Sequence, residues 1–151
     1  MKALVAFDSS YGNTERVAQA ICAGMKEVGM VDVSCKRIES TSPDDFRQAD
    51  VWVIGSPTHM GGPTRETKKA LKIAFGTGTE GKKGCAFDTR FAKVPGGAAE
   101  KVEAVMSERG VEILLKSEGF VVTGMKGLLA EGEEAKAVGF GRRIAGAIRP
   151  K

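Results

Sequence analysis

The residues best suited to chemistry lie in a polar segment, Asp8 to Glu15, which follows an apolar run near the N-terminus. Within it stand, in order, Ser9, Ser10, Tyr11, Gly12, Asn13 and Thr14. Hydroxyl groups donate hydrogen bonds, and a glycine lets a ligand approach the backbone closely. Because free N–H groups at the start of a helix attract anions, a loop of this kind predicts a phosphate-binding site. The alternative is that Asn13 or Thr14 only caps the helix.

Two further loops combine polar residues with glycines. The first runs from Gly55 to Pro63 and contains two adjacent glycines, which leave the backbone free to adopt unusual conformations. The second runs from Asp88 to Gly97 and contains one aromatic residue, Phe91, between basic neighbours. Neither loop contains a recognisable nucleophile or a general acid–base pair. We therefore expect residues that bind a ligand, and we assign no catalytic residue.

The hydrophobic pattern predicts that strands and helices alternate around these loops. Short apolar runs predict buried strands at residues 2–7, 31–38, 51–54, 84–87 and 119–122. Helical periodicity predicts helices over 13–28, from 63 through 75, over 98–108, and from Glu131 towards Arg149, whereas 40–45 has the composition of a loop. This alternation is typical of an open, mostly parallel sheet covered on both faces. Ligands bind such sheets beyond the carboxyl ends of the strands, where all three polar loops are expected.

The segment Ser9 to Thr14, placed after the first of five predicted strands, resembles the phosphate loop of flavodoxins, and the similarity extends over essentially the whole chain. The resemblance implies a flavodoxin-like three-layer α/β sandwich. Its five-stranded parallel sheet has the order 2-1-3-4-5, with helices on both faces, and one domain spans residues 1–151. The implied cofactor is non-covalently bound flavin mononucleotide (FMN). The short length and the lack of a long insertion in the fifth strand are similar to short-chain flavodoxins.

The resemblance also assigns roles to the three loops. Ser9 to Thr14 would hold the phosphate. The loop Thr58 to Gly62 would lie against one face of the isoalloxazine ring. In the family, a flexible glycine peptide in this loop flips and forms a hydrogen bond with N5 of the reduced flavin. Phe91 would cover the other face. The implied cofactor-binding residues are Ser9, Ser10, Tyr11, Gly12, Asn13, Thr14, Pro57, Thr58, His59, Met60, Gly61, Gly62, Asp88, Thr89, Arg90 and Phe91.

Simpler interpretations of three of these residues stay open. His59 could be an exposed loop histidine without a role, Met60 could belong to the core, and Phe91 could pack under its own loop. Either His59 or Met60 could cover the flavin face, since a histidine can stack or hydrogen-bond and a methionine is polarisable.

Composition limits the partners and the location. Lys and Arg number 23 against 19 Asp and Glu, which gives a net charge of +4. That is too little to imply nucleic acid, and no apolar run is long enough to span a membrane. Three cysteines without CxxC spacing favour free thiols over disulfides or a metal site, and no secretory signal is visible, so we expect a cytoplasmic protein. A basic excess that includes Arg90 and Lys93 beside the ring favours reduced, anionic flavin and acidic partners.

The leading hypothesis is an FMN-binding electron carrier that shuttles electrons between soluble redox partner proteins, as a monomer or weak dimer. One alternative is a small FMN-dependent reductase of the NAD(P)H:quinone type, although the chain leaves little room for a nicotinamide site. A second alternative is an interaction module with the same fold and no cofactor.

Overall fold

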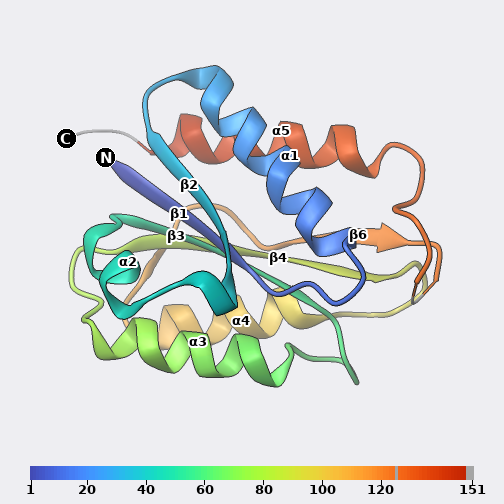
Figure 1. The fold of residues 1–151 in the computed structure, drawn as a ribbon, viewed down its shortest axis with the longest axis horizontal. Coiled ribbons are helices and arrows are strands. Elements are labelled where there is room, and N and C mark those ends of the chain that lie inside the picture. The colour runs from blue at the N-terminus through green and yellow to red at the C-terminus, as the bar shows by residue number, and fades with distance from the viewer. Residues whose placement is uncertain (125, 149–151) are drawn as a thin grey trace.

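The computed structural model describes residues 1–124 and 126–148. Its sheet contains β1 (Lys2–Phe7), β2 (Asp32–Arg37), β3 (Val51–Pro57), β4 (Lys83–Phe91), β5 (Glu112–Ile113) and β6 (Glu118–Val122). All neighbouring strands are parallel, and their order is β2-β1-β3-β4, with both β5 and β6 paired to β4 (Figure 1). The predicted order 2-1-3-4-5 is therefore confirmed. The fifth position of the sheet is filled by two short strands rather than one.

Within the described residues, five α-helices cover the sheet: α1 (Asn13–Val28), α2 (Pro43–Gln48), α3 (Arg65–Gly76), α4 (Ala98–Glu108) and α5 (Glu133–Ala147). A short 3-10 helix spans Ile38–Ser40. Helices α1 and α5 lie on one face, and α2, α3 and α4 lie on the other (Figure 1). No helix among the described residues is long and apolar enough to cross a membrane.

Alternate residues of each central strand face the two helical layers. Val5, Val53 and Cys85 pack beneath α1 and α5, whereas Leu4 and Trp52 pack against the opposite helices. All five side chains are almost completely buried. A strand that is buried on both faces is apolar at successive positions, which explains the continuous runs in the sequence.

Several elements differ from the sequence-based prediction, among them β3, which continues past the predicted end at residue 54 to Pro57, and β5, which was not predicted. The segment 40–45 was expected to be a loop, but α2 begins at Pro43, because Ser42 and Asp45 cap it reciprocally. Its Phe46 carbonyl accepts a hydrogen bond from the buried Trp52 indole, which fixes the helix on the sheet. Strand β4 continues to Phe91, so four residues predicted as loop belong to a strand. The end of the last predicted helix, near Arg149, lies outside the described residues.

Helices α1 and α5 approach each other through two glycines. A Cβ atom on Gly24 would lie 2.0 Å from the Val138 carbonyl oxygen, and one on Gly141 would lie 2.0 Å from the Ile21 carbonyl oxygen. No side chain fits at either position, so this close contact requires glycine. It fixes the position of α1, whose first turn enters the predicted phosphate loop.

Candidate functional site

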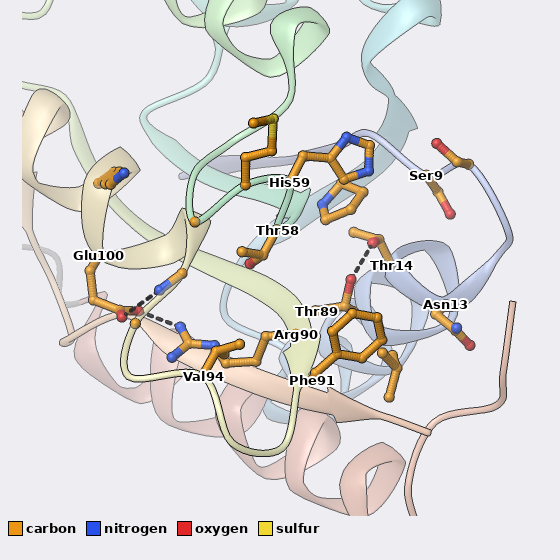
Figure 2. A pocket seen from close by; sticks show the side chains of 18 of the residues that line it. Ser9, Asn13, Thr14, Thr58, His59, Thr89, Arg90, Phe91, Val94 and Glu100 are labelled. Carbon is orange, nitrogen blue, oxygen red and sulfur yellow. Dashed lines mark hydrogen bonds and ion pairs between the residues drawn. The ribbon is translucent and has the colours of Figure 1, made fainter. Parts of the chain in front are cut away.

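A cavity of about 620 Å³ opens at the carboxyl edge of the sheet, between the loops that follow β1, β3 and β4. Thirteen of the sixteen predicted site residues line it: Ser9, Ser10, Tyr11, Asn13, Thr14, Pro57, Thr58, His59, Met60, Gly61, Thr89, Arg90 and Phe91. The structure thus brings the three loops together around one cavity (Figure 2). The other three predicted residues lie next to the cavity. Gly12 starts α1, Gly62 closes a turn, and Asp88 is buried behind Arg90.

The loop after β1 is built to leave the start of α1 open. Gly12 is the N-cap residue at φ +92°, a conformation that favours glycine, and it provides no side-chain cap. Ser9 Oγ accepts hydrogen bonds from the Gly12 N–H at 3.1 Å and the Glu15 N–H at 3.4 Å. The hypothesis that Asn13 or Thr14 merely caps the helix is wrong, because the Asn13 amide donates to the Gly127 carbonyl and Thr14 bonds elsewhere. Ser9 thus occupies the Glu15 N–H, whereas among the described residues no acceptor contacts the Asn13 or Thr14 N–H, and these two groups are available to an anion.

Thr14 and Thr89 form the floor of the cavity. Their hydroxyl oxygens are 2.9 Å apart, and both residues are buried. This contact joins the first turn of α1 to the end of β4. In Figure 2 the His59 imidazole and the Phe91 ring lie on either side of this threonine pair. The threonine pair thus lies between two walls of the cavity, one formed by the loop after β3 and the other by β4.

The loop after β3 is a tight turn with left-handed backbone. His59 and Gly62 exchange both of their backbone hydrogen bonds, at 2.8 and 2.9 Å. Between them Met60 has φ +50° and Gly61 has φ +79°, which corresponds to a type I′ turn. Positive φ is uncommon for methionine, and the Met60 side chain is fully exposed. The interpretation of Met60 as a core residue is therefore wrong, and the histidine beside it is also exposed.

Beside the opposite wall lies a network of three charged residues. Arg90 donates to Asp88 through Nε at 2.8 Å and Nη2 at 2.7 Å, and Nη2 also contacts Glu100. The slot is narrow: a Cβ on Gly119 would lie 2.3 Å from Arg90 Nε, and a Cβ on Gly97 would lie 2.5 Å from Asp88 Oδ2. The Asp88 side chain is fully buried, and that of Arg90 is 16% exposed.

These contacts change the charge that Arg90 offers to a ligand. Two carboxylates face one guanidinium, so Arg90 does not add to the basic excess that was predicted, from Arg90 and Lys93, beside the ring. Hydrogen bonds to Asp88 raise the Arg90 pKa despite its partial burial. Burial tends to raise the pKa of Glu100, but the bonds from Arg90 and from the Gly97 N–H outweigh it and hold that pKa below its usual value.

Phe91 ends β4 with its ring 48% exposed at the cavity. It does not pack under its own loop. Residues that the sequence interpretation did not assign to the site also line the cavity: Val94, Pro95, Gly96, Gly97, Glu100, Lys101 and Val122. The first four belong to the loop predicted after the fourth strand. Glu100 had a detectable signal, because an acid three residues after Gly97 can accept from the N–H at the start of a helix.

The fold and the cavity together define a doubly wound α/β protein with a mononucleotide-type site at the carboxyl edge of its sheet. The family model described as flavodoxin matches residues 5–138, and the chain belongs to the flavodoxin family. A flavodoxin of Clostridium saccharobutylicum is 27% identical, over 99% of this chain and 98% of its own length. The type A flavoprotein fprA of Rhodobacter capsulatus is 33% identical over 94% of this chain, which spans only 32% of that longer protein. The crystal structure of oxidised Flavodoxin 1 from Bacillus cereus superposes with a TM-score of 0.82 at 19% identity, covering 99% of this chain and all of that one.

Proteins of this family bind FMN, and the residues present here fit that cofactor. One end of the cavity offers hydroxyl groups and the start of α1, whose N-cap residue Gly12 has no side chain, and both suit a phosphate dianion. The other end offers the Phe91 ring and the apolar side chains of Met60 and Val94, which suit a flat heteroaromatic ring. The volume lies within the range of small-molecule sites.

Proposed function

We propose that this protein is an FMN-dependent electron carrier that exchanges electrons with soluble redox partner proteins. The observation that supports this most directly is that one cavity joins a phosphate-type loop to an aromatic wall that remains half exposed. An electron carrier needs a cofactor edge that a partner can approach, and it needs no substrate pocket of its own. FMN supplies the redox chemistry, because its ring accepts and donates electrons one or two at a time.

The chain's own residues would bind and orient the cofactor. Ser9, Ser10 and the first-turn N–H groups of α1 would hold the phosphate, with Tyr11 and Thr14 beside them. The type I′ turn would lie beside the edge of the flavin ring, and its Gly61 has left-handed backbone. The Gly61 peptide can reorient at low cost, because glycine tolerates both signs of φ.

The remaining features of the proposal concern partners and location. A net charge of +4 supports partners with acidic docking surfaces. The three cysteines are free thiols, which suits a reducing compartment such as the cytoplasm. We propose that the carrier acts as a monomer or weak dimer, which analytical ultracentrifugation of the FMN-loaded protein would test.

Titration with FMN tests the central claim. Binding would shift the visible spectrum of the flavin and change its fluorescence, and Ser10→Ala should weaken affinity by about tenfold, because a hydrogen bond to a charged group is lost. Ser107→Ala, an exposed position on α4 outside the cavity, is the matched control and should leave affinity unchanged. No binding at micromolar FMN would refute the proposal. Rapid NAD(P)H oxidation with a quinone by the isolated protein would instead favour the reductase alternative.

A further inference from the structure

Helix α3 presents a basic face to solvent. Its Arg65, Lys68, Lys69 and Lys72 occupy helical positions i, i+3, i+4 and i+7, which places them on one stripe. We call these four residues the α3 basic face. All four are exposed, whereas the opposite side of the helix buries Thr67, Ala70, Leu71 and Ala74. Among the described residues, no acid forms an ion pair with any of the four.

The stability of the helix does not explain this charge pattern. Arg65 lies beside Glu66 in the first turn, and the last turn contains no basic residue, so the helix dipole does not account for the four cations. Arg65 and Lys69, like Lys68 and Lys72, are like charges four residues apart, an arrangement that destabilises a helix. The four cations and Glu66 give α3 a charge of 4 − 1 = +3, out of +4 for the chain.

The α3 basic face adjoins the mouth of the cavity. The turn from His59 to Gly62 runs directly into the first turn of α3 (Figure 1). On the other side of that turn, a Cβ atom on Gly62 would lie 3.5 Å from Lys101 Nζ, and Lys101 lines the cavity. Positive charge therefore extends from α3 to the edge at which the cofactor would be exposed.

Exposed apolar side chains accompany these cations. Met60 is fully exposed at the tip of the turn, and Ile73 is 48% exposed beside Lys72 and Lys69. An exposed, polarisable methionine is typical of surfaces that contact more than one protein. A single-stranded nucleic acid would instead call for aromatic residues interleaved with the cations, and α3 contains none on its exposed face.

We propose that the α3 basic face is the docking surface for an acidic one-electron carrier protein, which approaches with its redox centre over the Met60 turn. This inference rests on the function proposed above. Attraction between opposite charges would steer the encounter, and the small interface would allow rapid release. In the transfer step, one electron leaves the reduced centre of the partner and passes to the bound flavin. The partner is thereby oxidised, and any proton that the flavin takes up comes from solvent.

Stopped-flow kinetics with a reduced, acidic plant-type [2Fe–2S] ferredoxin as the probe test the proposal on the FMN-loaded protein. For the unmodified chain, the second-order rate constant should fall steeply as ionic strength rises. The double variant Lys68→Glu, Lys72→Glu should slow transfer at low ionic strength by about tenfold or more. The matched control is Lys26→Glu, Lys116→Glu, which changes net charge equally at exposed sites outside α3 and should slow transfer by less than about threefold.

The results separate failure of the docking surface from failure of the proposed function. FMN affinity is measured first, and both double variants should match the unmodified protein, since none of the four lysines lines the cavity. Loss of FMN binding in the unmodified chain would remove the carrier function itself. Normal FMN binding with equal ferredoxin rates for the two double variants would overturn the docking surface alone. A second result would also overturn it. In that case the unmodified protein binds a DNA duplex or anionic vesicles, and the Lys68→Glu, Lys72→Glu variant loses this binding while its ferredoxin rate is unchanged.

Discussion

Arg90→Ala should destabilise the protein strongly, although Arg90 lies near the surface of a cavity. The substitution leaves Asp88, whose side chain is fully buried, with the Ala99 N–H at 2.8 Å as its remaining hydrogen-bond donor. Removing one partner of a buried ion pair costs about 3–5 kcal/mol. Because the Ala99 contact survives, we expect the lower end, about 3 kcal/mol. For a domain of this size that lowers Tm by roughly 6–12 °C.

The measurement is thermal unfolding of the protein without added FMN, so that cofactor binding does not contribute. Arg47→Ala is the control, because Arg47 pairs with Asp44 at 2.9 Å while both side chains are about 60% exposed. Such an exposed pair contributes at most about 1 kcal/mol. The double variant Arg90→Met, Asp88→Leu should recover part of the loss, since it removes the buried charge as well. A Tm for Arg90→Ala within about 2 °C of the unmodified protein would refute this reasoning.

Three further predictions concern pH, packing and thiols. The pKa of Glu100 is held below its usual value in the folded state. Its contribution to the free energy of unfolding is therefore present above the unfolded pKa and is lost as the pH falls through the folded pKa. Glu100→Gln should flatten the acid side of the profile of stability against pH, measured by urea unfolding. Gly141→Ala should destabilise by about 2 kcal/mol in the same assay, because its Cβ would overlap the Ile21 carbonyl. Gly139 has open space around it, so Gly139→Ala should be neutral or stabilising. Equal changes in stability for the two alanine variants would argue against the close contact between Gly141 and Ile21. Burial raises the pKa of Cys85 to about 12, so a thiol reagent at pH 8 should modify Cys85 only after unfolding. A hydrogen bond with Cys22 lowers the pKa of Cys35, so Cys35 should react with the same reagent in the native state.

The order of the sheet and the three loops could be predicted from sequence because local patterns determine them. Continuous apolar runs identify strands that are buried on both faces, and each polar loop follows such a run directly. Helix α2 was also within reach, because Ser42 and Asp45 form a capping box around Pro43. Its six residues are too few for helical periodicity to show.

Tertiary contacts could not be predicted in the same way. Arg90 was predicted to add positive charge beside the ring, because the local sequence does not show that Glu100, ten residues later, contacts it from α4. Likewise Met60 is apolar, and only the pair of backbone bonds between His59 and Gly62 places it at the tip of a turn. Asp88 to Phe91 are polar or charged at most positions, yet β4 continues through them, because β6 pairs with all four residues and β3 pairs with Asp88 and Thr89.

The bond between Thr14 and Thr89 has a consequence for the order in which the molecule acquires its site. These residues are 75 positions apart in the chain. Thr14 lies on α1, which follows β1, Thr89 lies on β4, and β3 separates β1 from β4 in the sheet. The two hydroxyls therefore meet only after β3 has been inserted and β4 has paired with it. A growing chain that ends before β4 has the whole phosphate-type loop but no cavity floor. Ligand affinity in this protein is thus a property of the completed sheet, and a ligand that binds it stabilises the entire fold rather than one loop.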